Sequence, residues 1–208
     1  MIAIFNGCKS KMKQIDLIVS HESLPRFTTL LQSGIYLEVA QGTSIANLLF
    51  NLPGFSAEYV KASVQTIFLN GLPADNLEQQ LFGEQIVLAI SAAMPGLAGA
   101  IFRKDGAHAS LRTETAAELL RTENDKQPAQ VRLKLFNIIA IERGAELLGN
   151  GCTIPASSFC QFLAYRPPLF ANISSVTLDN AVVDPATLTS HLQNEKMIKL
   201  TIRSSHGS

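Results

Sequence analysis

The chain has 208 residues, 47% of them hydrophobic, so its length suits one or two folded domains and its composition argues against disorder. Seventeen basic residues balance seventeen acidic residues, so no overall field points to nucleic acid or an anionic membrane, although local patches remain open. No run approaches the roughly 18 apolar residues of a membrane span, and residues 1–5 are shorter than a signal-peptide core, so a cytoplasmic location is expected.

The first part of the chain has the patterns of two strand–helix pairs. Hydrophobic periodicity predicts, in order, a strand at 14–20, a helix at 24–32, a strand at 34–40 and a helix at 45–52. Pro25 is tolerated in the first turn of the first helix, and Thr43 or Ser44 is a natural N-cap for the second. Residues 1–13 are expected to form an extra edge strand or a frayed end.

The next stretch defines the fold more than any other. A β-branched and aromatic strand at 65–69 ends at Asn70-Gly71, a dipeptide that accepts positive φ readily. Residues 77–82 have the apolar spacing of one helical turn, and a closing apolar strand follows at 84–90. Strand, turn, helical turn and strand is the order of the C-terminal half of a β-grasp, or ubiquitin-like, domain.

This layout resembles the family of small sulfur carriers that includes the molybdopterin synthase small subunit and the thiamine sulfur carrier. The resemblance is carried by short motifs at Glu38-Val39, Gly42-Thr43-Ser44, Leu48-Leu49, Leu69-Asn70-Gly71, and Gly83-Glu84 with Ile86 and Leu88. It implies a β-grasp fold. Sulfur carriers end in a free Gly-Gly, whereas residues 96–99 run on into further chain and residues 204–208 read SSHGS, so carrier activity is not assumed.

The second half repeats the order of elements in the first half. Its predicted segments are a strand at 130–136, a helix at 138–148, a strand at 151–154, a helix at 155–165, a strand at 174–178, a helical turn at 184–193 and a strand at 197–202. We therefore expect an α+β protein with two tandem β-grasp domains, at 1–93 and 130–208.

The connector at 94–129 is expected to be partly structured. Asp105-Gly106 lies between the short runs 100–103 and 107–111, a pattern that predicts a hairpin with a primed turn. A capping box at 115–118 predicts a short helix after the hairpin.

Basic residues of this connector, together with two glycines, are candidates for an anion site. The set consists of Gly99, Arg103, Lys104, Gly106, His108 and Arg112. In a hairpin Arg103 and Lys104 would point to opposite faces, and the alternative for the set is a solvated hairpin tip. Cleavage after Gly99 would expose Ala98-Gly99 as a degenerate carrier tail, and the alternative for this pair is a tight turn into the hairpin.

The three cysteines, Cys8, Cys152 and Cys160, are expected to be reduced thiols because they form no C-x-x-C pair. Lysines near Cys8 would lower its pKa and make it a reactive thiol, whereas Cys152 and Cys160 are expected to be buried. The four histidines are isolated from one another in sequence, and no nucleophile elbow or Cys-His arrangement occurs. No catalytic residue, metal site or cofactor is therefore predicted.

The favoured function is a non-catalytic protein-interaction module that binds a protein partner, one that serves cofactor or sulfur metabolism if the resemblance holds. The alternative is a sulfur-carrier-like protein activated after processing near Gly99 or at an atypical C-terminus. An independent enzyme is the third hypothesis and rests only on the basic connector and Cys8. Homodimerisation by strand addition at an exposed sheet edge is compatible with the pattern but not required by it.

Overall fold

Residues 12–112 and 127–205 are described by a computed structural model, in which every strand predicted at 14–93 and at 130–208 forms close to its expected position. The edge strand or frayed end expected at 1–13 lies almost entirely outside the described residues. The side chain of Ser44 accepts a hydrogen bond from the Asn47 backbone N–H, 3.1 Å away, so the predicted N-cap is confirmed. Asn70 and Gly71 both have positive φ, as their turn requires. The elements before the connector are β1 (Lys13–Val19), α1 (Leu24–Phe27), η1 (Thr28–Gln32), β2 (Ile35–Val39), β3 (Thr43–Ser44), α2 (Ile45–Phe50), α3 (Ala57–Ser63), β4 (Thr66–Leu69), β5 (Leu72–Pro73), β6 (Gln80–Leu81) and β7 (Gln85–Ser91).

The remaining elements are those of the connector and of the second half, and the strands and helices predicted for the second half form in the predicted order. The side chain of Asp184 accepts a hydrogen bond from the backbone N–H of Ala186 and so caps a short helix. Asp179 and Asn180 have positive φ in the turn that corresponds to Asn70-Gly71 in the first half. These elements are α4 (Gly96–Phe102), η2 (Ala109–Leu111), β8 (Ala129–Leu135), α5 (Asn137–Asn150), β9 (Cys152–Pro155), α6 (Ala156–Ala164), α7 (Pro167–Phe170), β10 (Ile173–Leu178), β11 (Ala181–Val182), η3 (Pro185–Thr187), α8 (Leu188–His191) and β12 (Met197–Ser204).

The predicted hairpin at 100–111 is wrong. Its first part is the end of α4, and its last part is η2, with a turn at Asp105 (φ 54°) between them. Leucine and alanine residues favour a helix in this run, and Gly99 has no side chain, so it lies directly against the carbonyl of Met94. The predicted helix at 115–118 lies outside the described residues.

The predicted helical turn at 77–82 is also wrong, because the segment forms a turn and the short strand β6. Its carbonyls serve another element: Leu77 O accepts from the Ala46 N–H at 2.8 Å, and Gln79 O accepts from the Ile45 N–H at 3.0 Å. Both donors belong to the first turn of α2, where backbone N–H groups have no partner within the helix. Tertiary contact therefore replaces the local helical bonds that the apolar spacing suggested.

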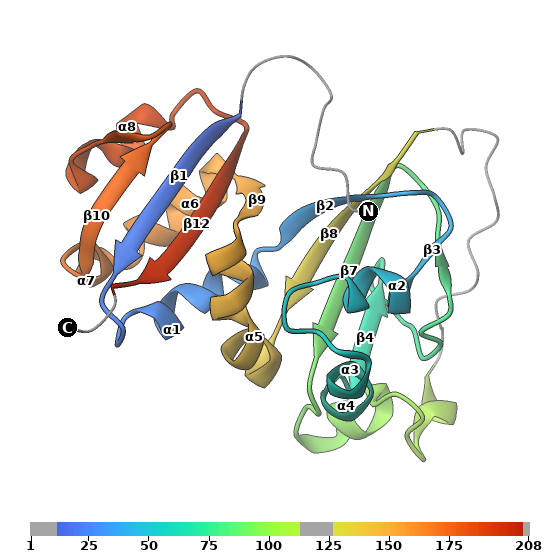
Figure 1. The fold of residues 1–208 in the computed structure, drawn as a ribbon. Coiled ribbons are helices and arrows are strands. Elements are labelled where there is room, and N and C mark those ends of the chain that lie inside the picture. The colour runs from blue at the N-terminus through green and yellow to red at the C-terminus, as the bar shows by residue number, and fades with distance from the viewer. Residues whose placement is uncertain (1–11, 113–126, 206–208) are drawn as a thin grey trace.

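In the described residues the strands form a ten-stranded mixed sheet and a two-stranded ribbon of β3 with β6. The sheet consists of a first strand group, β2-β8-β7-β4-β5, and a second strand group, β9-β12-β1-β10-β11, which meet at β2 and β9 (Figure 1). Within each group, successive neighbours are antiparallel, parallel, antiparallel and antiparallel. The protein is thus a mixture of helices with a large mixed sheet, which confirms the α+β class.

The two halves of the chain exchange one strand each. In Figure 1 the blue β1 lies between the orange β10 and the red β12, whereas the yellow β8 lies beside the green β7. Strand pairing therefore crosses the expected boundary between 1–93 and 130–208 in both directions, and the domain division stays a prediction. Each exchanged strand lies between two neighbours in its group. Both strands bury apolar side chains with at most 1% exposure: Ile15, Leu17, Val19, Val131, Leu133 and Leu135.

Two helical connections lead from the exchanged strands back to the other strand group. The α1–η1 segment leads from β1 to β2, and α5 leads from β8 to β9. These connections pack closely at Gly144, where an added Cβ would lie 2.7 Å from Thr28 Cβ and 2.9 Å from Leu31 Cδ1. At the other side of α5, the Tyr59 hydroxyl donates to Glu142 Oε2 at 2.7 Å. No helix of the described residues has the length and apolar composition needed to cross a membrane.

Candidate functional site

A basic pocket lies where the C-terminal ends of α3 and α4 meet the residue before β4. Its volume is about 580 Å³, and Ala100, Gly106 and Ala107 contribute small side chains or none to its lining. The polar residues of the basic pocket are Lys61, Gln65, Arg103, Lys104, Asp105 and His108. Of the six residues predicted for an anion site, Arg103, Lys104, Gly106 and His108 therefore line one pocket, whereas Gly99 and Arg112 do not.

The geometry of Arg103 and Lys104 is set by Gln65. The backbone N–H of Lys104 donates to Gln65 O at 2.6 Å, and Nε of Arg103 donates to Gln65 Oε1 at 3.1 Å. These bonds place both residues beside Lys61 in the last turn of α3. In a hairpin the side chains of Arg103 and Lys104 would have pointed to opposite faces. The segment is not a strand, so this expectation does not apply.

Positive charge is in excess in the basic pocket. Lys61, Arg103 and Lys104 carry three positive charges, against one negative charge on Asp105. Among the described residues, none of these four charged groups forms an ion pair. The cations therefore keep donors for an external anion, and they face solvent, where each pairing contributes a modest energy.

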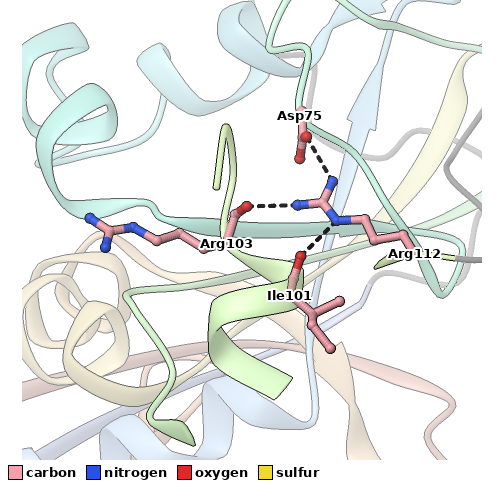
Figure 2. Close-up of polar contacts among 4 residues, drawn as sticks. All are labelled: Asp75, Ile101, Arg103 and Arg112. Atoms are coloured by element: carbon pink, nitrogen blue, oxygen red, sulfur yellow. Dashed lines mark hydrogen bonds and ion pairs between the residues drawn. The ribbon is translucent and has the colours of Figure 1, made fainter. Parts of the chain in front are cut away.

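Arg112 does not line the basic pocket but holds its wall (Figure 2). Its side chain is 2% exposed, and each of its three guanidinium nitrogens contacts one oxygen acceptor. Nη1 binds Asp75 Oδ2 at 2.7 Å, Nε donates to Ile101 O at 2.8 Å, and Nη2 donates to Arg103 O at 2.6 Å. The carbonyls belong to the C-terminal end of α4, where a cation is favoured and backbone acceptors need partners.

The proposed tail residues Ala98 and Gly99 lie inside α4. Ala98 is exposed, but Gly99 is buried against the Met94 carbonyl and its own carbonyl accepts from the Arg103 N–H at 3.0 Å. An extended tail ending at Gly99 would require α4 to unwind.

The described cysteines are held as thiols. Burial raises the pKa of Cys152 to about 12, and its Sγ donates to Leu200 O at 3.6 Å. Cys160 was predicted to be buried but is half-buried in α6, and this partial burial raises its pKa. Cys8 lies outside the described residues. No group of three or more histidine, cysteine, aspartate or glutamate side chains within residues 12–112 and 127–205 is arranged to hold a metal ion.

Sequence reasoning missed three polar members of the basic pocket, Lys61, Gln65 and Asp105. Gln65 precedes Arg103 by 38 residues, and no local pattern links the two. Sequence reasoning also missed an apolar groove of about 440 Å³ that lies beside α4. Its lining includes Phe68, whose ring centroid is 5.3 Å from that of Phe102 in α4, together with Val87, Ala89, Met94 and Phe136.

No family model, curated protein or solved structure matches the chain. The resemblance to sulfur carriers therefore remains a prediction from the motifs. Function has to be inferred from the basic pocket, the neighbouring apolar groove and the topology of the sheet.

Proposed function

We propose that this chain is a non-catalytic protein-interaction module built from two β-grasp-like units of the sulfur-carrier type, and that the basic pocket binds an acidic segment of a protein partner. The strand order supports the β-grasp part. A β-grasp sheet has two parallel strands at its centre with antiparallel strands on both sides, and this arrangement occurs at β8–β7 and at β12–β1. The strand exchange makes each unit a composite of both halves.

The observation that carries the proposal is the unpaired positive charge on a fixed wall. Arg112 fixes the backbone of Arg103, and Gln65 fixes both Arg103 and Lys104, so the cations are presented by an ordered segment. Preorganised charges lose less entropy on binding and steer an oppositely charged partner to the surface. Exposed pairs contribute only about 0.2–1 kcal/mol each, so charge alone gives orientation and rate more than affinity.

Affinity in this proposal comes from the apolar groove beside α4. Leu97, on α4, is 70% exposed, and the groove is lined by Phe68, Met94 and Phe136. Burial of apolar surface contributes about 25 cal/mol per Å² before the cost of association. The partner segment is therefore expected to combine acidic residues with one or two large apolar side chains.

The raised pKa of Cys152 and Cys160 supports a role without a cysteine nucleophile, because the thiolate is the reactive form. A sulfur carrier processed near Gly99 is the alternative. Intact-mass measurement on the chain from its native cell separates the two. A chain shortened to Gly99, or one with a C-terminal thiocarboxylate, would support the carrier and reject the interaction module.

Charge reversal tests the interaction module directly. The partner that copurifies in stoichiometric amount is identified, and its association rate is measured with the Lys61→Glu/Arg103→Glu variant at several salt concentrations. We expect at least about a tenfold loss of association rate at low salt, and a weaker salt dependence. The control is Arg26→Glu/Lys196→Glu, which reverses two exposed cations outside the pocket. Equal effects of the two variants, or no partner, would reject the proposal.

A further inference from the structure

The two strand groups meet at a single residue pair, and a crevice opens beside it. Tyr36 of β2 pairs with Thr153 of β9, whereas each strand is otherwise paired on its far side, β2 with β8 and β9 with β12. Past this pair, β2 and β9 diverge around a crevice of about 180 Å³. Glu38, Asn150, Gly151 and Lys199 also line this junction crevice.

The register of the sheet places the key side chains on one face. Thr153 is opposite both Tyr36 and Lys199, so these three residues share a face. Glu38 follows Tyr36 by two positions in the same strand and lies on that face as well. The crevice therefore has a carboxylate on the β2 side and an ammonium group on the β12 side, with a hydroxyl between the two strands.

Gly151 leaves the space between these charges open. It adopts φ +85°, and an added Cβ would lie 3.3 Å from Lys199 Cε and 3.2 Å from Thr201 Oγ1. The stem of Lys199 thus passes beside the glycine, on the face that also carries Glu38. A side chain at position 151 would fill part of the crevice and displace Lys199.

Neither charge is satisfied within the described residues. Glu38 and Lys199 form no ion pair there, and no side-chain hydrogen bond of either residue is present. Burial raises the pKa of Glu38, and no cation of the described residues offsets this effect. A carboxylate and an ammonium group that lack partners in the described residues are each able to form a charge-assisted hydrogen bond with a ligand.

We infer that the junction crevice binds a free amino acid or an equally small zwitterion, with the ligand ammonium on Glu38 and the ligand carboxylate on Lys199. Its size suits this class, since a cavity of about 150 Å³ accommodates benzene. The Thr153 hydroxyl and the Asn150 amide add hydrogen-bonding groups to the lining. This site shares no residue with the basic pocket, and because it joins β2 to β9, a bound ligand would tie the two strand groups together.

The test is a titration of the full chain with glycine, serine and valine, followed by amide NMR and calorimetry. Acetate and methylammonium serve as probes that carry one charge each. We expect amide shift changes at Tyr36, Gly151 and Thr153 with the amino acids, and at least about tenfold weaker binding of either single-charge probe, because each lacks one charge-assisted hydrogen bond.

Two near-isosteric variants assign the charges. Glu38→Gln and Lys199→Met are each expected to weaken amino-acid binding by at least about tenfold, whereas Glu84→Gln and Lys196→Met, at exposed positions, leave it unchanged. No shift change with any amino acid, equal binding of acetate, or unchanged affinity in the folded Glu38→Gln variant would each overturn the inference. If a variant fails to fold, the selectivity of the wild-type chain for amino acids over single-charge probes decides the matter.

Discussion

The two strand groups share one pattern of strand directions but place the borrowed strand differently. In the first strand group, β8 lies between β2 and β7, one strand away from the end of the group that meets β9. In the second, β1 lies between β12 and β10. β1 is thus the link between β12 and the β10–β11 pair within the described residues. The difference teaches that the groups are not independent copies: each is completed by the other half, and the second depends on β1 at its centre.

The first strand group also carries a docked helix. After β7 the chain forms α4, whose Phe102 ring lies against Phe68 of the sheet, and Arg112 holds the end of that helix. The basic pocket and the apolar groove therefore belong to the first strand group, whereas the junction crevice draws on both.

The largest expected effect comes from the borrowed strands. Leu17→Ala in β1 and Leu133→Ala in β8 should each lower the free energy of unfolding by about 2–5 kcal/mol, because both side chains are fully buried. Urea denaturation should show one transition, with hydrogen-exchange protection lost in both strand groups. Ile18→Ala, on the less buried face of β1, is the control and should cost less. Loss of protection in one group alone would show that the groups fold independently.

The packing of the two crossing connections gives the next effect. Gly144→Ala should destabilise the chain by about 1–3 kcal/mol, because the new methyl group meets Thr28 and Leu31 in the α1–η1 segment. The matched control is Gly149→Ala in the same helix, where an added Cβ meets only Ile202 O at 3.9 Å. That change should stabilise by about 0.5–1 kcal/mol through helix propensity. Thermal unfolding compares the two, and equal shifts in melting temperature would contradict the close contact.

Arg112→Met should sharpen the difference between the groups. The variant leaves Asp75 and the carbonyls of Ile101 and Arg103 without their donor, at a cost of about 1–2 kcal/mol. We expect faster hydrogen exchange over residues 96–112 and little change in β10 and β12. Arg26→Met, an exposed change, is the control. Uniformly faster exchange over both strand groups would mean that Arg112 supports more than the docked helix.

The smallest expected effect on stability at neutral pH comes from the ionisation of Cys152, which lies at the junction of the two strand groups. Its pKa is raised from 9.0 to about 12 in the folded chain, so the neutral thiol favours folding. Its contribution is complete below pH 9 and is lost as the pH rises through the folded pKa, by about 1.4 kcal/mol per unit between the two values. Alkylation at pH 9 should reach Cys152 only after unfolding, with Cys152→Ser identifying its signal. Rapid labelling of the native chain would contradict its burial.

Local signals in the sequence determined the secondary structure well. The alternation at 14–20 and 130–136 predicted β1 and β8, and Asn70-Gly71 predicted a turn with positive φ. The cap at Ser44 forms as expected, and Asp184 caps the helical turn that was predicted at 184–193. These features depend on residues within a few positions of one another, so the chain itself carries the information.

Part of the candidate site was also predictable. Charge and spacing pointed to Arg103, Lys104 and His108, which do line one pocket. The same reasoning placed Arg112 with them because composition cannot tell a cation that faces solvent from one whose donors are taken by Asp75 and by backbone carbonyls.

Only the tertiary structure decided which strands are neighbours, that 96–102 docks as a helix, and that Gln65 meets Arg103. An alternating pattern specifies which face of a strand is buried, but it does not specify the neighbouring strand. Any strand of the right length can form the backbone hydrogen bonds. Likewise, the basic pocket and the junction crevice arise where segments distant in sequence meet. Periodicity is a local property, whereas strand pairing and packing are properties of the whole chain.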